Sequence, residues 1–197
     1  KDTSADRYLS SRGLNGRNFQ SLRFFDHLRY AEKSKDGSSW EEKYYEGILC
    51  RIDSSEEECF NVLRIYLDNG QKAKVKAPKK VFGKEISGGF IKLEEINPDD
   101  GRLGLAEGVE TAMSAGILHG MPVWSVISTF NFKNFVPPEG VKELFIFSDN
   151  DSNFVGQKEA FTAASVLAQK YKSLKISVVI PPEVNSDWND VLLSSKR

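Results

Sequence analysis

The sequence predicts an α/β fold: a mostly parallel β-sheet flanked by helices, preceded by a smaller, mainly β (α+β) subdomain. The region from about residue 40 to residue 93 has an apolar period of two, which is typical of strands. After residue 101, short apolar runs alternate with helical segments, as in parallel sheets covered by helices. The linker Asn-Pro-Asp-Asp-Gly at residues 97–101 separates the two patterns. We therefore expect subdomains at residues 1–97 and 101–197.

The first subdomain is predicted to begin with a helix over residues 4–12, because Gly13 follows as a stop signal. Strands are expected at residues 44–50, 59–67, 72–76 and 90–93. The sequence Asp-Asn-Gly at residues 68–70 is a strong hairpin signal and should join the second of these strands to the third.

The second subdomain is predicted to alternate strands and helices in order along the chain. Strands are expected at residues 103–106, 123–127, 141–147 and 174–180, with helices at residues 110–118 and 156–171. A final helical segment is expected at residues 189–193, after the proline pair at residues 181–182 closes the last strand.

The composition excludes several classes of protein. With 197 residues, 40% of them hydrophobic and a net charge of −1, the chain is neither disordered nor a disulfide scaffold. No apolar run approaches a membrane span, and the two cysteines, Cys50 and Cys59, have no ligand-like companions that would indicate zinc. We expect a cytoplasmic location, and the first residue, Lys1, suggests a piece of a longer polypeptide.

Acidic residues follow three of the predicted parallel strands. Glu107 comes after the first, Asp149 and Asp151 after the third, and Asp187 and Asp190 after the fourth. The carboxyl ends of parallel strands form the usual ligand-binding edge of such sheets. An all-oxygen set suits a hard cation such as Mg²⁺ (or Mn²⁺), which acts on phosphates.

These acids allow two other interpretations. A single acid at a strand end is often only a helix cap, and this applies most to Asp190 and to Glu110. The pattern that begins at Asp149 also resembles a calcium-binding EF-hand loop. Its sixth position is Phe154 instead of glycine and its twelfth is Ala160 instead of glutamate, so calcium binding of that kind is excluded.

A basic segment precedes the linker. Residues 71–92 contain seven lysines and one acid, a local excess of six positive charges. Lys72, Lys74 and Lys76 alternate as on a solvated edge strand. Lys79 and Lys80 are predicted to lie in a turn, which with Lys84 makes them candidates for contacts with nucleic acid or nucleotide phosphates. Arg64, at strand period, is a further candidate.

The stretches LAEGVETAMSA, FSDND and DWNDVL resemble the Toprim domain of plasmid- and phage-encoded primases and primase–helicases, which are related to DnaG. The upstream stretches YLSSRGL and GQKAKVKAPKKVFGKEISGGFIKL are similar to the segment that precedes Toprim in those primases. The resemblance implies a Toprim-type sheet in the second subdomain and the catalytic core of a DNA primase. Such an enzyme makes short RNA primers on single-stranded DNA by metal-dependent nucleotidyl transfer.

The resemblance also implies roles for particular residues and partners. Asp149 and Asp151 would be metal ligands, Glu107 a ligand or the proton acceptor for the primer's 3′-hydroxyl, and Asp187 a metal or nucleotide-site residue. The partners would be a single-stranded DNA template, ribonucleoside triphosphates and a replicative helicase or fused helicase domain. The alternatives are a Toprim-type metal-dependent nuclease and a non-catalytic DNA-binding or docking module.

Overall fold

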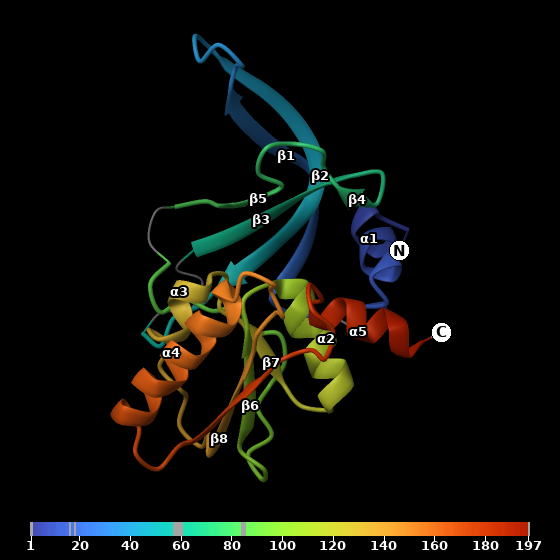
Figure 1. Cartoon of the computed structure of the whole chain (residues 1–197). Coiled ribbons are helices and arrows are strands. Elements are labelled where there is room, and N and C mark those ends of the chain that lie inside the picture. Colours follow the sequence, from blue (N-terminus) through green and yellow to red (C-terminus); the bar gives the residue numbers. More distant parts are fainter. Residues whose placement is uncertain (1, 16, 18, 57–60, 84–85, 197) are drawn as a thin grey trace.

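The computed structural model of the protein describes residues 2–15, 17, 19–56, 61–83 and 86–196 (Figure 1). Two sheets make up its framework. The N-terminal sheet is antiparallel, and the C-terminal sheet consists of four parallel strands with helices on both faces. The predicted fold class is therefore confirmed. Among the described residues, no helix is both long enough and apolar enough to cross a lipid bilayer.

The N-terminal sheet is built on a long hairpin. Its elements are α1 (Ser4–Ser11), β1 (Leu22–Lys33), β2 (Trp40–Ile52), β3 (Asn61–Asp68), β4 (Gln71–Lys72) and β5 (Lys79–Val81). The strand order is β1-β2-β3-β4, and β5 pairs with residues 63–65 of β3, nearer the start of that strand than β4. Figure 1 shows the distal part of the β1–β2 hairpin projecting away from the rest of the molecule.

The strand β1 was missed by the sequence analysis. Its register with β2 shifts between Phe25 and Leu28, so a β-bulge interrupts the two-residue period. Most of its first half is also exposed, which leaves little apolar alternation to detect.

Two strand predictions in the basic segment were wrong. The strand expected at residues 72–76 ends at Lys72, because the amide of Val75 donates to the carbonyl of Ala73 and turns the chain. The strand expected at residues 90–93 is reduced to two isolated bridges, one at Phe90 and one at Ile91. The hairpin predicted at residues 68–70 is present between β3 and β4.

The C-terminal half alternates strands and helices as predicted. Its elements are β6 (Arg102–Ala106), α2 (Val109–His119), β7 (Val123–Ser125), α3 (Thr129–Phe132), β8 (Glu143–Phe147), α4 (Val155–Lys170), β9 (Lys175–Val179) and α5 (Trp188–Ser195). The strand order is β7-β6-β8-β9. After β6 the chain adds β7 on one side of that strand and then β8 on the other side. The carboxyl ends of β6 and β8 therefore border a crevice, which is where sheets of this kind bind ligands.

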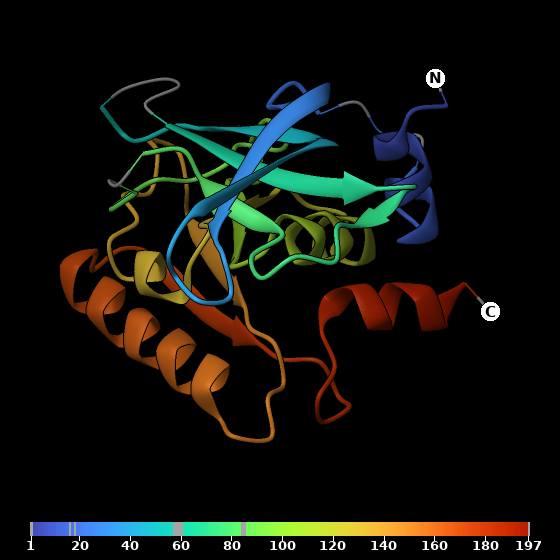
Figure 2. The ribbon, with the colours of Figure 1, turned by 90° about the horizontal axis from the view of Figure 1, so that it is seen from above.

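The two halves share one hydrophobic core. One cluster of buried side chains runs from Tyr8 and Ile65 in the N-terminal half to Met113 in α2 and Leu192 in α5. A second cluster, which includes Leu105 and Ala160, lies on the other face of the parallel sheet beneath α4. Figure 2 shows α4 and α5 on opposite sides of the parallel sheet, with α1 next to α5.

The centre of the parallel sheet leaves no room for an added methyl group at Gly104. A Cβ at this position would lie 2.6 Å from the Phe147 ring and 2.7 Å from Cγ2 of Val123. We expect Gly104→Ala to lower the free energy of unfolding by about 1–3 kcal/mol, measured by urea denaturation. The control Gln169→Ala, on an exposed position of α4, should change it by less than about 0.5 kcal/mol. Equal stability of the two variants would contradict this packing.

Candidate functional site

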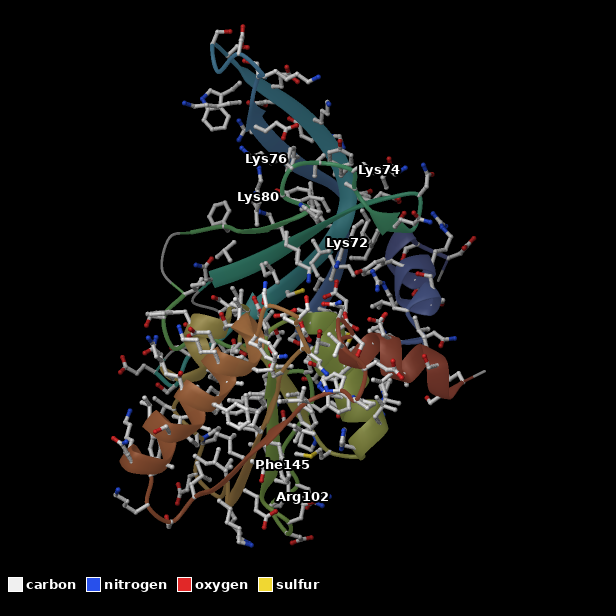
Figure 3. The ribbon with its side chains drawn as sticks, in the orientation of Figure 1. Lys72, Lys74, Lys76, Lys80, Arg102 and Phe145 are labelled. Carbon is white, nitrogen blue, oxygen red and sulfur yellow. The ribbon has the colours of Figure 1, made fainter. Side chains whose placement is uncertain are left out.

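The predicted acids meet at the carboxyl edge of the parallel sheet. Glu107 follows β6, and Asp149 and Asp151 follow β8. All three line one pocket of about 190 Å³, together with Thr129, Phe132, Phe147, Ser148, Val155 and Gly156. Figure 3 shows Arg102, the first residue of β6, at the end of the sheet remote from the N-terminal half. The carboxyl edge with its acids therefore faces the antiparallel sheet.

Local backbone geometry fixes the positions of these carboxylates. The amide of Gly156, in the first turn of α4, donates to Oδ2 of Asp151 at 3.1 Å. A Cβ at Gly156 would lie 2.9 Å from that same oxygen, so glycine permits the approach. The carbonyl of Glu107 accepts hydrogen bonds from the Ser125 hydroxyl and the Ile127 amide.

Two residues near the pocket hold a left-handed backbone conformation although they are not glycines. Ile127 has φ +72° and Phe154 has φ +60°. For a β-branched or bulky residue this conformation costs free energy, and it persists only where the surrounding structure enforces it. Phe154 directly precedes α4, so the strained turn brings the start of that helix to Asp151.

The carboxylates are close enough to perturb each other's charge. Burial, together with the negative charges of Asp187, Glu107 and Asp151, raises the pKa of Asp149 to about 7. The pKa of Glu107 is raised by burial and by Asp151, whereas the Lys79 ammonium acts against that rise. A cluster with this much mutual repulsion is stabilised by a cation.

The donor chemistry fits a small hard cation. All three side chains offer oxygen, and Mg²⁺ or Mn²⁺ prefers carboxylate oxygens and retains several waters. Among the residues that the structure describes, no three acidic, histidine or cysteine side chains already stand in the arrangement of a complete metal site. The residues that would hold the ion are Glu107, Asp149 and Asp151, and its binding would draw their carboxylates together.

Asp187 has a second task in the structure. It is the N-cap of α5, where its Oδ1 accepts from the amides of Asn189 (2.8 Å) and Asp190 (2.9 Å). The carboxylate of Asp190 accepts from the amide of Asp187 in return, which confirms that Asp190 is an exposed helix-starting acid. The charge of Asp187 still acts on Asp149. Its role as a metal or nucleotide ligand stays a prediction.

The structure separates the predicted basic residues. Lys79 and Lys80 lie in the strand β5, not in a turn, because the segment pairs with β3. Neighbouring residues of a strand point to opposite faces. The ammonium of Lys80 donates to the carbonyl of Ala31 at 2.7 Å and lies 3.7 Å from the centre of the Tyr30 ring. Lys80 is thus held on the β1 side, whereas Lys79 faces the acids.

Arg64 lies on the same face of the antiparallel sheet as Lys80. Arg64 is paired with Lys80 across β3 and β5, and its guanidinium lies over the exposed Phe82 ring, 5.5 Å from its centre. Lys84 lies outside the described residues. Of the predicted basic residues within the described chain, Lys79 is therefore the one whose charge acts on Glu107.

A buried acid near the site was misjudged from the sequence. Glu110 was expected to be a simple helix-starting acid and Lys72 a solvated edge residue. In the structure Glu110 is 6% exposed and contacts Tyr8, Lys72 and Lys79. The available signal was a lone charge between apolar and small residues, which requires a buried partner.

A larger pocket of about 570 Å³ lies apart from these acids. Its lining includes Arg51, Lys92 and Trp124. Both cations already have carboxylate partners, because Arg51 contacts Asp53 and Lys92 contacts Glu95. It therefore offers no free cluster of catalytic groups within the described chain.

The ionisation of Asp149 should make the metal-free protein less stable as the pH rises. Because its pKa is about 7 when folded and 3.8 normally, the folded state loses stability from about pH 4 to pH 7. Asp149→Asn removes this effect. We expect the Asp149→Asn variant to have a free energy of unfolding about 1–3 kcal/mol higher than the parent near pH 8 in metal-free buffer. Near pH 4 the two proteins should be equally stable. Thermal unfolding at both pH values checks this, and a pH-independent difference would contradict it.

Each half of the chain matches one known protein family. Residues 102–197 match the family profile described as "Toprim domain", and residues 1–93 match one described as "Domain of unknown function (DUF7146)". A search of curated protein sequences found no match.

Solved structures of primases share the fold of the whole chain. A DNA primase domain from Pseudomonas aeruginosa superposes with a TM-score of 0.67 at 16% identity, covering 98% of this chain and 68% of that one. The DnaG primase catalytic domain bound to ssDNA gives 0.65 at 12% identity, covering 98% and 70%. The primase fragment of the bacteriophage T7 primase-helicase gives 0.53 at 14% identity, covering 96% and 65%. At these identities the likeness establishes a primase-like fold and nothing finer.

Proposed function

We propose, from the match of residues 102–197 to the Toprim domain family, that the chain is the catalytic core of a DNA primase. It would synthesise short RNA primers on single-stranded DNA by template-directed, metal-dependent nucleotidyl transfer. Its partners would be the template strand, ribonucleoside triphosphates and a replicative helicase or fused helicase domain. The likeness to the primase fragment of the bacteriophage T7 primase-helicase supports a helicase as partner.

The observation that carries the proposal is the placement of the three acids. Glu107, Asp149 and Asp151 come from two neighbouring parallel strands, line one pocket and face the N-terminal half, which contributes Lys79. Oxygen ligands for a divalent cation beside a lysine are suited to phosphate chemistry. The likeness to primase catalytic domains extends over 98% of the chain, so it includes the N-terminal half as well. This favours a primase over a nuclease that shares only the Toprim domain.

The reaction assigns a task to each of these residues. Glu107, Asp149 and Asp151 would hold Mg²⁺ or Mn²⁺, and the bound ion would neutralise phosphate charge and polarise the reacting phosphoryl group. Glu107, whose pKa is raised by burial, is suited to accept the proton of the primer's 3′-hydroxyl. The 3′-oxygen forms a bond to the α-phosphorus, the bond to the β-phosphate oxygen breaks, and pyrophosphate leaves. Lys79 would contact the phosphates.

An assay with labelled ribonucleotides, single-stranded DNA and magnesium tests this function. A primase yields labelled products longer than the nucleotides supplied, a nuclease yields shortened DNA, and a docking module yields only a mobility shift on a native gel. Asp99→Asn, an exposed acid in the linker far from the pocket, is a matched control that should behave as the parent does. Shortened DNA or a shift alone would contradict the primase proposal.

A further inference from the structure

Glu110 is a buried carboxylate at the contact between the two halves of the molecule. It lies in the first turn of α2 and accepts three donors from the N-terminal half. The Tyr8 hydroxyl donates at 2.5 Å, the Lys79 ammonium at 2.7 Å, and the Lys72 ammonium lies at 3.0 Å. Helix α1 and strands β4 and β5 therefore all meet at one side chain.

This cluster contains one more positive charge than negative charge. Burial alone would raise the pKa of Glu110, but the ammonium groups of Lys79 and Lys72 together hold it well below its usual range. The carboxylate therefore stays ionised at neutral pH and neutralises one of the two lysines. Both lysines also stand at the amino end of α2, where a cation is unfavourable without such a partner.

The lysine that Glu110 holds is the one that reaches the proposed active site. Nζ of Lys79 lies 3.9 Å from the position that a Cβ on Gly108 would take, and its charge acts on Glu107. Its side chain remains 33% exposed. The ammonium carries three N–H groups and gives one of them to Glu110, so it can donate to a phosphate while it stays anchored.

We propose that Glu110 is a positioning residue for the nucleotide: it fixes the ammonium of Lys79 beside Glu107, where that ammonium binds a phosphate of the incoming triphosphate. This inference rests on the proposed function. Without Glu110, a lysine on a strand would turn toward solvent or pair directly with Glu107. Either change removes the phosphate contact, even though the lysine keeps its charge.

Two variants separate anchoring from simple charge attraction. Lys72→Met keeps the pair of Glu110 and Lys79 and lowers the charge of the cluster by one. Lys72→Met with Glu110→Gln restores the parent's cluster charge but removes the anchor of Lys79. If attraction alone mattered, the double variant would bind a triphosphate as tightly as the parent does.

The measurement is the Kd of inorganic tripolyphosphate with excess Mg²⁺, by isothermal titration calorimetry at a temperature where circular dichroism shows each protein folded. We expect the double variant to bind tripolyphosphate about tenfold more weakly than Lys72→Met does, because it loses one charge-assisted hydrogen bond to the phosphate. Equal affinity of the two variants would overturn the inference. So would a parent protein that does not bind tripolyphosphate.

A third variant covers the case in which the double variant does not fold. Glu110→Asp keeps the charge but shortens the side chain, and we expect it to weaken tripolyphosphate binding several-fold; unchanged binding overturns the inference. Because this assay needs no template and no synthesis, its outcome is independent of primer formation. A parent that binds tripolyphosphate but makes no primers would refute the proposed function and leave the anchor intact.

Discussion

Replacing Asp151 or Asp149 with asparagine is expected to abolish primer synthesis while the protein stays folded. Each substitution would remove one of the three carboxylates that we propose as metal ligands at this pocket. A bound divalent ion contributes several kcal/mol of charge stabilisation, so we expect the rate to fall by about 10²-fold or more. The fold should survive, because burial of charge and repulsion between neighbouring acids both disfavour the ionised form of Asp149, and the asparagine reduces these costs.

Labelled-primer assays on the parent and on both variants measure this effect, with circular dichroism to confirm folding. The control Asp99→Asn removes an exposed acid outside the pocket and should retain full activity. A folded Asp151→Asn protein that makes primers at the rate of the parent would show that the site is assigned to the wrong residues.

The largest loss of stability is expected for Glu110→Ala. The substitution removes the buried acceptor that Lys72, Lys79 and the Tyr8 hydroxyl share at the contact between the two halves. Removing one partner of a buried ion pair costs about 3–5 kcal/mol, a large part of the stability of an ordinary domain. Urea denaturation of the parent and the variant measures the difference.

The control for this prediction is an exposed ion pair. Glu42 contacts Arg29 on the projecting hairpin, and Glu42→Ala should lower the free energy of unfolding far less than Glu110→Ala does. The pH dependence gives a further check. Because the pKa of Glu110 is lowered in the folded state, its stabilising effect is complete above its ordinary pKa and is lost progressively as the pH falls below that value. A Glu110→Ala protein as stable as Glu42→Ala would refute the buried network.

The parallel sheet could be predicted from sequence because its signals are local. Each strand is a short apolar run, and each acid follows its strand within a few residues, so topology alone brings Glu107, Asp149 and Asp151 to one edge. The Toprim resemblance, confirmed for residues 102–197, rests on the same short motifs. The strand β1 was not predicted, because its β-bulge interrupts the two-residue apolar period by which a strand is recognised.

The rest of the site depends on pairings that the sequence does not display. Lys79 and Lys80 are adjacent in the chain, and only the register of β5 with β3 decides which of them faces the acids. Glu110 looks like an ordinary helix-starting acid until Tyr8, more than a hundred residues away in sequence, is placed beside it. Such contacts arise from the packing of one half of the protein against the other, which local patterns do not encode.

The central claim is that Glu107, Asp149 and Asp151 together bind a divalent cation. Anomalous diffraction from crystals soaked in Mn²⁺ tests it most directly, since it locates the metal without any assay of activity. The account predicts an anomalous peak in the pocket at the carboxyl ends of β6 and β8, with oxygens of these carboxylates about 2 Å away. Ordered manganese bound only at other residues, with this pocket empty, would contradict the claim.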